Sequence, residues 1–251
     1  MLAFARETRL SETTFVQTPS AAGADYRNRI WSAPGEMPFA GHPSLGTAVA
    51  VARAGGQATA VYVQQTGAGL QRVEVQLDGD HARASMLQEP PSFASRPAPA
   101  EALAAAGLPS GAADPQREPQ VVSTGLAHLL VPLKERAALA DAAPDRQAMR
   151  SLLAPLGATV LYLAALAAED RVAYARGFFL DPAGVTEDPA TGSAAGPLLA
   201  YLRERDGIDE LTVHQGVEMG RPSRIECAWA HDRPRVSGAA VVVADGEVLL
   251  P

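Results

Sequence analysis

The chain has 251 residues, of which 47% are hydrophobic, so it can bury a sizeable core and is not a disordered protein. A formal charge of −7 argues against the broad basic patches that bind nucleic acid or anionic membranes. The longest apolar stretch, 160–168, is too short to span a bilayer, and charges at Arg6 and Glu7 come too early for a signal peptide.

Cysteine and lysine usage narrows the chemistry further. The single cysteine, Cys227, excludes an internal disulfide and predicts a reducing, cytoplasmic setting. Lys134 is the only lysine among 21 basic residues and lies in a charged stretch, which argues against a pyridoxal Schiff base. No Walker lysine, Gly-x-Ser-x-Gly elbow or histidine pair at metal-ligand spacing occurs. We therefore expect chemistry without cofactor or metal, carried by carboxylates, histidine and backbone amides.

Strand patterns dominate the first part of the chain. Segments that are β-branched or alternate in polarity predict strands at 13–18, 25–31, 59–66 and 70–77. A nearly uniformly apolar run at 44–54, followed by Gly55 and Gly56, predicts a helix buried within its lobe. The proline-dense segment 88–99 predicts a link between two lobes.

The second part mixes both kinds of element. Helices are expected at 100–106 and 145–156, and a further helix at about 193–205, which Pro197 delays so that 189–192 is a loop. Strands are expected at 120–123, 127–133, 159–166, 171–180, 211–215, 224–230, 235–243 and 247–250. We place an N-terminal lobe at 1–95, which can also recruit the C-terminal strand 244–251, and a C-terminal lobe at 96–243.

A short segment of the chain occurs twice. Pro-Ser-Leu-Gly-Thr-Ala at 43–48 matches Pro-Ala-Thr-Gly-Ser-Ala at 189–194, and turn residues precede each copy. An apolar helical run follows each copy, and then a strand that ends in similar residues. Such self-similarity indicates two related structural units. His42 and Asp188 directly precede the two prolines, so the repeat predicts a site between two lobes.

Each repeated segment is expected at a helix start. Unpaired N–H groups and the positive end of the helix dipole would favour a carboxylate there. Gly46 and Gly192 would allow close approach, while Thr47 and Ser193 could cap the helix or donate hydrogen bonds. The alternative is that both segments are simply well-formed helix starts. The matched pair favours ligand binding.

Three motifs resemble a known family. Leu-Ser-Glu-Thr-Thr-Phe at 10–15, Pro-Phe-Ala-Gly-His-Pro at 38–43 and Glu-Asp-Pro-Ala-Thr-Gly-Ser at 187–193 resemble the PhzF-like proteins, the phenazine-biosynthesis isomerase family. Segments 123–125 and 215–223 look like further family stretches, so the resemblance covers nearly the whole chain. It implies an α+β, diaminopimelate-epimerase-like fold. In that fold two pseudo-symmetric lobes each wrap a mostly antiparallel sheet or barrel around a central helix. It also implies a homodimer.

The resemblance assigns roles residue by residue. Glu12 matches the acid–base that lifts and returns a carbon-bound proton, a task that partial burial of a carboxyl favours. His42 matches a partner that relays or stabilises charge, and Asp188 matches the aspartate of the second helix loop. The alternatives are a surface glutamate at a strand start, a histidine that merely precedes a proline, and an aspartate that caps a helix.

Seven further residues are expected to line the substrate: Ser11, Gly41, Pro43, Gly46, Thr191, Gly192 and Ser193. The epimerase relatives use a cysteine pair at these lobe positions, which this chain lacks. Cys227 lies in an alternating strand and is interpreted as a packing residue. Proton shuttling by one base, Glu12, is therefore expected instead of a two-thiol racemase.

The N-terminus departs from the resemblance. Family members usually open with a strand and a Gly-Asn-Pro segment, and neither is present before the motif at 10–15. We therefore expect an unpaired edge in the first lobe, or an element from a partner that covers it.

The sequence predicts a cofactor-independent isomerase or epimerase that moves a proton on carbon of a small carboxylated metabolite. The resemblance names a dihydro-hydroxyanthranilate as the family substrate. The first alternative is a non-catalytic protein of the same fold that binds a small anion, and a second is a dimeric scaffold that neither binds nor catalyses.

Overall fold

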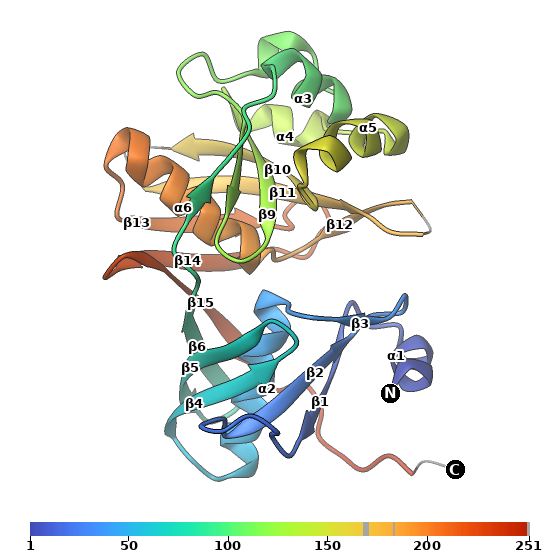
Figure 1. Ribbon diagram of the computed structural model, residues 1–251, viewed down its shortest axis with the longest axis vertical. Helices are drawn as coiled ribbons and strands as arrows, with labels where there is room; N and C mark the ends of the chain where they lie inside the picture. The colour runs from blue at the N-terminus through green and yellow to red at the C-terminus, as the bar shows by residue number, and fades with distance from the viewer. Residues whose placement is uncertain (168–170, 183, 250–251) are drawn as a thin grey trace. The chain divides into compact units, whose positions relative to one another are not determined.

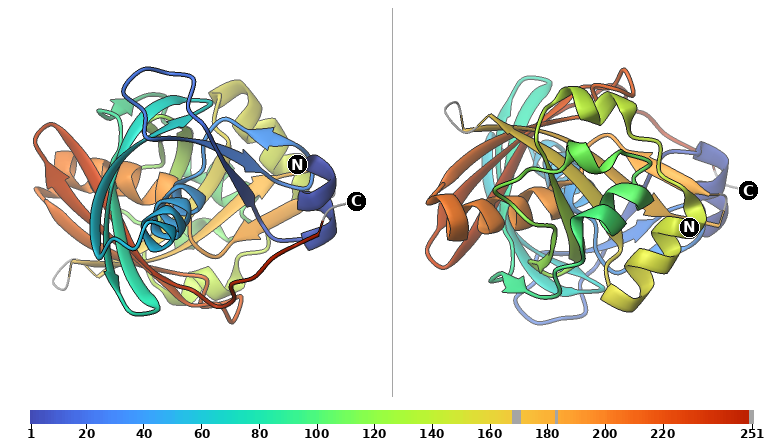
Figure 2. Two further views of the ribbon diagram at one scale, coloured as in Figure 1. Left: turned by 90° about the horizontal axis from the view of Figure 1, so that it is seen from below. Right: turned by 90° about the horizontal axis from the view of Figure 1, so that it is seen from above.

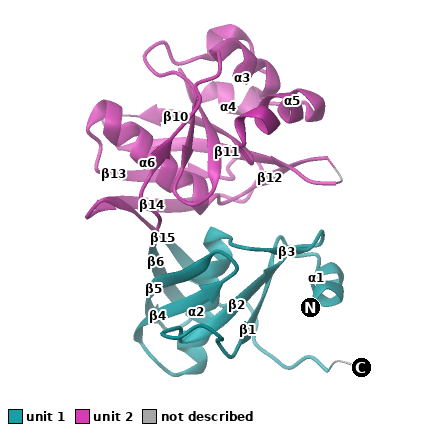
Figure 3. Cartoon of the chain, in the orientation of Figure 1, with its two compact units in different colours: residues 1–86, 237–251 teal, residues 87–236 magenta. Residues whose placement is uncertain are grey.

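A computed structural model of the chain describes residues 1–167, 171–182 and 184–249. Its elements fall into two units (Figure 3). Unit 1 is Met1–Met86 together with the chain from Ser237 onward, and unit 2 is Leu87–Val236. The polypeptide thus leaves unit 1 after Met86 and re-enters it through a late strand.

Unit 1 contains two helices and a mostly antiparallel sheet (Figure 1). Its elements are α1 (Leu2–Thr8), β1 (Thr13–Gln17), β2 (Tyr26–Trp31), β3 (Glu36–Met37), α2 (Gly41–Ala54), β4 (Thr59–Thr66), β5 (Gly69–Asp78) and β6 (His81–Leu87). The strand order is β1-β2-β4-β5-β6, with β3 paired to β2. Among these described pairs β2 and β4 are parallel and the others are antiparallel. β15 (Arg233–Val241) follows β6 in the strand order.

Helix α2 forms the centre of unit 1. Its small buried residues, among them Ala48, Val49 and Ala52, pack on Val73 and Val75 of β5. Alanines allow the helix to approach the sheet closely, and the view from below shows the strands of unit 1 around it (Figure 2). This packing fixes the start of α2 relative to β1, where the first candidate residues lie.

Unit 2 is larger and contains most of the helices. Its elements are β7 (Ser92–Phe93), α3 (Pro99–Ala105), the 3₁₀ turn η1 (Ser110–Ala112), β8 (Gln120–Ser123), β9 (Ala127–Leu133), α4 (Ala137–Asp141), α5 (Arg146–Leu156), β10 (Val160–Ala167), β11 (Val172–Leu180), β12 (Val185–Asp188), α6 (Gly192–Asp206), β13 (Glu210–Gln215) and β14 (Ser223–Ala230). The strand order is β14-β13-β11-β10-β9-β8-β7, with β12 paired to β11. β9–β10 and β11–β13 pair in parallel.

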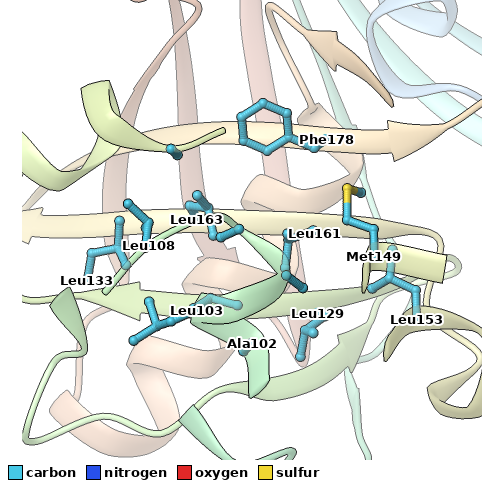
Figure 4. Close-up of a cluster of buried hydrophobic side chains, with 14 of the residues drawn as sticks. Ala102, Leu103, Leu108, Leu129, Leu133, Met149, Leu153, Leu161, Leu163 and Phe178 are labelled. Atoms are coloured by element: carbon cyan, nitrogen blue, oxygen red, sulfur yellow. The ribbon is translucent and has the colours of Figure 1, made fainter. Parts of the chain in front are cut away.

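The central strand β10 is buried on both faces. Leu161 and Leu163 point into a core shared with α3, α4 and α5 (Figure 4), whereas Tyr162 points into a second core around α6. Because successive side chains of a strand alternate between faces, β10 and β9 each serve both layers. Leu129 and Leu130 of β9 follow the same alternation, which places His128 on the α6 face with Leu130.

The predicted fold class, α+β with a sheet wrapped around a helix in each lobe, is confirmed. The strand expected at 247–250 is wrong over the described residues, because 242–249 contain no regular structure and Leu250 lies outside the described part. The side chains of Val243 and Leu249 in this segment are each 93% exposed, so they do not pack on the hydrophobic core. Helix α2 begins at Gly41 and not at residue 44, and β6 and β12 were not predicted.

No helix in the described part of the chain is long and apolar enough to cross a lipid bilayer.

Candidate functional site

Glu12 lies where the chain enters β1, and two threonine pairs fix it there. The hydroxyls of Thr8 and Thr13 lie 3.2 Å apart across the turn between α1 and β1. The hydroxyl of Thr47 in α2 lies 2.8 Å from that of Thr14 in β1, and Thr47 also donates to the carbonyl of Pro43 at 2.7 Å. The first residues of β1 are therefore tied to the first turns of α2.

The carboxylate of Glu12 is mostly buried beside a histidine. Oε2 of Glu12 lies 3.0 Å from Nε2 of His42, and the two side chains are 16% and 44% exposed. Oε2 itself is buried and accepts no hydrogen bond from the described residues, so the contact has the distance of an ion pair but not the direction of a hydrogen bond. A buried carboxylate oxygen without a donor is available to take up a proton.

The start of α2 supplies His42. Ala40 is extended, with φ −149° and ψ 141°, and ends the preceding loop. The N–H and the hydroxyl of Ser44 both donate to the carbonyl of Ala40, at 3.3 and 2.7 Å, and fix the first turn. Gly41 is partly buried. Because it is the first helical residue, its N–H is one of the four at the helix start that have no acceptor within the helix.

The other candidates of unit 1 differ in their accessibility. Ser11 is exposed immediately before Glu12, whereas Pro43 is buried in the first turn of α2. Gly46 is exposed and a Cβ placed on it would meet nothing within 4 Å. It is the sixth residue of α2, because the helix begins at Gly41, three residues earlier than the predicted start at residue 44.

In unit 2, Asp188 organises the loop before α6. Its Oδ1 accepts from the N–H of Ala190 at 3.1 Å and its Oδ2 from the hydroxyl of Thr191 at 2.9 Å. Thr191 is the N-cap residue of α6 and is buried. Asp188 is therefore not the N-cap residue of α6. Its carboxylate instead fixes Thr191, which is the N-cap residue.

Buried Gln215 completes this loop from β13. Its Nε2 donates to the carbonyl of Asp188 at 2.6 Å and to the Thr191 hydroxyl at 2.8 Å, and its Oε1 accepts from the N–H of Thr191 and from the hydroxyl of Tyr162. Gly177 of β11 packs directly against this loop, because a Cβ placed on it would lie 2.6 Å from the Thr191 hydroxyl oxygen. The loop that feeds α6 is thus held from several sides.

The first residues of α6 are partly buried. Gly192 donates to the carbonyl of Ala190 at 3.1 Å, and its own carbonyl accepts from the side chain of Gln88 at 2.9 Å. The N–H of Ser193, the second residue of α6, has no partner among the hydrogen bonds of the described residues. It is the kind of donor that a helix start offers to an anion.

Two polar residues that support this loop were not predicted from the sequence. Nε2 of His128 lies 3.1 Å from the hydroxyl of Ser193, and Nδ1 lies 2.7 Å from the carbonyl of Leu126. His128 and Gln215 are both 0% exposed. The signal for His128 in the sequence is that it is a polar residue in a strand of otherwise apolar residues, which requires a hydrogen-bond partner. Gln215 lies in a mixed strand, and its only signal is that it begins the stretch 215–223 that resembles the family.

The single cysteine of the chain is unsuited to catalysis. Cys227 packs in the core around α6, and burial raises the pKa of its thiol to about 12, so that no thiolate forms near neutral pH. No group of three or more metal-ligating side chains occurs among the residues that the structure describes.

The predicted site residues fall into two sets. Glu12 and His42 are brought together in unit 1, while Asp188, Thr191, Gly192 and Ser193 gather at the α6 start of unit 2.

A family model and curated relatives match nearly the whole chain. The family model described as "Phenazine biosynthesis-like protein" matches residues 1–246. Among curated proteins, trans-2,3-dihydro-3-hydroxyanthranilate isomerase of Pseudomonas aeruginosa is 38% identical, over 100% of this chain and 88% of the relative.

Solved structures of similar proteins share the fold. A PhzF-family phenazine biosynthesis protein of Bacillus anthracis matches with a TM-score of 0.83 and 26% identity, covering 100% of this chain and 88% of that one. A predicted epimerase of Pseudomonas aeruginosa matches with a TM-score of 0.79 and 31% identity, over 97% and 88%.

Proposed function

Because the chain belongs to the family of phenazine biosynthesis-like proteins and is 38% identical to a curated isomerase, we propose that it moves a proton between carbon atoms of a small carboxylated metabolite. No cofactor is needed for such a step when a carboxylate serves as the base.

The geometry of Glu12 supports this proposal more than any other observation. Its Oε2 is buried, accepts no hydrogen bond from the described residues and lies 3.0 Å from His42. A structural carboxylate buried to this degree would normally be satisfied by donors, as the carboxylate of Asp188 is. An unsatisfied one is costly to stability and is useful as a base that accepts a proton from carbon.

The proposed reaction is balanced without an oxidant. Glu12 takes a proton from an sp³ carbon next to a C=C bond, and the C–H electron pair becomes part of a new double bond. The original double bond shifts, and its electron pair takes up a proton from Glu12 at a carbon further along. The imidazole of His42 contacts the carboxylate and reaches solvent, so that it can exchange protons between Glu12 and water.

For the substrate, we propose trans-2,3-dihydro-3-hydroxyanthranilate or a close analogue. The relative that carries this name is 38% identical over the whole of this chain. The compound has a carboxylate, which the unbonded N–H of Ser193 at the α6 start suits. It also has an amine and a hydroxyl, which need polar partners.

Turnover of this compound by the purified protein tests the proposal. We expect the wild type to consume it, the Glu12→Gln variant to be at least about 100-fold slower, and the Glu7→Gln variant to match the wild type. Glu7 is an exposed glutamate of α1 and serves as the matched control. Binding without turnover in the wild type would instead support a non-catalytic binding protein.

A further inference from the structure

His128 and Ser193 form a hydrogen-bonded pair that joins β9 to α6. Residue 128 lies on the face of β9 that points to α6, and its side chain is fully buried. Nε2 lies 3.1 Å from the Ser193 hydroxyl, and Nδ1 lies 2.7 Å from the carbonyl of Leu126. The imidazole therefore uses both nitrogens within unit 2.

The carbonyl of Leu126 determines which nitrogen carries the hydrogen. A carbonyl can only accept, so Nδ1 must be the donor of the 2.7 Å bond. In a neutral imidazole Nε2 is then bare and can only accept. The hydroxyl of Ser193 must therefore donate its single hydrogen to Nε2.

The ring stays neutral in this environment. Burial lowers the pKa of His128 to about 4, and no carboxylate is bonded to it to stabilise a charge. For the same reason His128 is a poor general base for Ser193, since taking the hydroxyl proton would create a buried imidazolium. The pair thus holds the proton of Ser193 in place and does not activate the oxygen as a nucleophile.

We propose that His128 is a positioning residue, which commits the Ser193 hydroxyl as a donor to the imidazole and leaves its oxygen able only to accept from a bound metabolite. The inference rests on the proposed function, in that it takes Ser193 to contact the substrate. The N–H of Ser193 then binds the carboxylate, while Oγ of the same residue binds an amine or hydroxyl hydrogen. The α6 start would thus select acids that carry a neighbouring hydrogen-bond donor.

Three variants separate this role from packing. In His128→Gln the side-chain oxygen can replace Nε2 as the acceptor for Ser193. In His128→Asn the amide can still donate to the Leu126 carbonyl, but no atom reaches Ser193, so that its hydroxyl is released. Ser193→Ala removes the hydroxyl altogether. The probes are benzoate, which has no donor, and 2-aminobenzoate, which has one beside the carboxylate, with affinities measured by calorimetry.

We expect the wild type and His128→Gln to bind 2-aminobenzoate about two- to tenfold more tightly than benzoate, as one net hydrogen bond allows. In Ser193→Ala the preference should fall to about one. In His128→Asn it should fall as well, because the released hydroxyl can turn its hydrogen to the carboxylate of either acid, and adding His128→Asn to Ser193→Ala should change nothing further. The inference is overturned if His128→Asn keeps the full preference for 2-aminobenzoate or if His128→Gln loses it. It is also overturned if the wild type binds neither acid, or binds both equally well.

Nitrogen NMR of the histidine-labelled protein gives a readout that a packing role would not move. Nδ1 of His128 should carry the hydrogen, and the Nε2 signal should shift in Ser193→Ala and on adding 2-aminobenzoate to the wild type. A hydrogen on Nε2 would overturn the inference. A wild type that meets these expectations but does not turn over the dihydro compound overturns only the proposed function; normal turnover with an unchanged preference in His128→Asn overturns only the inference.

Discussion

Nε2 of His42 lies 3.0 Å from Oε2 of Glu12, and the two side chains differ in their access to water. The imidazole is 44% exposed, whereas the carboxylate side chain is 16% exposed. Oε2 of Glu12 is buried, and the imidazole that contacts it is the more exposed of the two groups. This asymmetry separates the transfer of a proton on the substrate from its exchange with the medium.

A His42→Gln substitution should slow solvent exchange more than isomerisation. Glutamine preserves a polar contact near Glu12 but cannot titrate, so the proton that Glu12 takes from carbon returns to the product more often. With substrate deuterated at the abstracted position, mass spectrometry should find more label in the product of His42→Gln than in that of the wild type. Equal retention in both proteins would show that His42 is not the route.

Thr47→Val should loosen the connection between β1 and α2. The buried hydroxyl of Thr47 bonds to Pro43 and to Thr14, and valine removes both contacts with little change of shape. We expect the free energy of unfolding in urea to fall by about 1–2 kcal/mol. Turnover should fall as well, because Glu12 directly precedes β1 and moves with its first residues. Thr59→Val, at an exposed position of β4, is the control and should leave both unchanged.

Gly196→Ala should destabilise unit 2, whereas Gly46→Ala should not destabilise unit 1. A Cβ on Gly196 would overlap Oε1 of Gln88, which also accepts from Thr124. Overpacking of this kind costs about 1–3 kcal/mol. Gly46 has open space around its Cβ position in α2, so alanine there should stabilise by about 0.5–1 kcal/mol.

The Gln88→Ala background provides the check on this cause, because it removes the overlapping atom. Gly196→Ala should then shift the urea midpoint less than it does in the wild type. An equal shift in both backgrounds would exclude Gln88 as the cause.

His128 should make stability depend on pH in acid. Its pKa is lowered from 6.5 to about 4 in the fold, so the unfolded chain binds the proton more readily. The neutral, folded form is fully favoured above pH 6.5, and stability is lost as the pH falls from 6.5 to about 4. The loss attributable to this residue is on the order of 3 kcal/mol. His128→Gln should lose correspondingly less between these pH values in urea titrations; the same loss in both proteins would contradict the assignment.

Several elements of the fold follow from local pattern. The β-branched segment at 59–66 and the alternation after it predicted β4 and β5, because their periodicity is that of half-buried strands. β6 was missed although its burial alternates, since its inward residues Ala82 and Ala84 are too small to mark a strand. The strand at 247–250 was predicted from apolar residues that are exposed over the described part.

The candidate site was predictable only in part. The motifs identified Glu12 and His42, and the structure places them in contact. The start of α2 was misplaced because the sequence does not show that Ala40 is extended and that Pro43 fits the first turn. The bond between His128 and Ser193 joins residues 65 positions apart, and no local pattern reveals such a pair.

Deuterium incorporation is the most direct measurement for the role of Glu12. The protein is incubated with trans-2,3-dihydro-3-hydroxyanthranilate in heavy water, and the label on carbon is followed by NMR. We expect incorporation by the wild type and, in Glu12→Gln, a rate at least about 100-fold lower with binding retained. Incorporation by Glu12→Gln at the wild-type rate would contradict it.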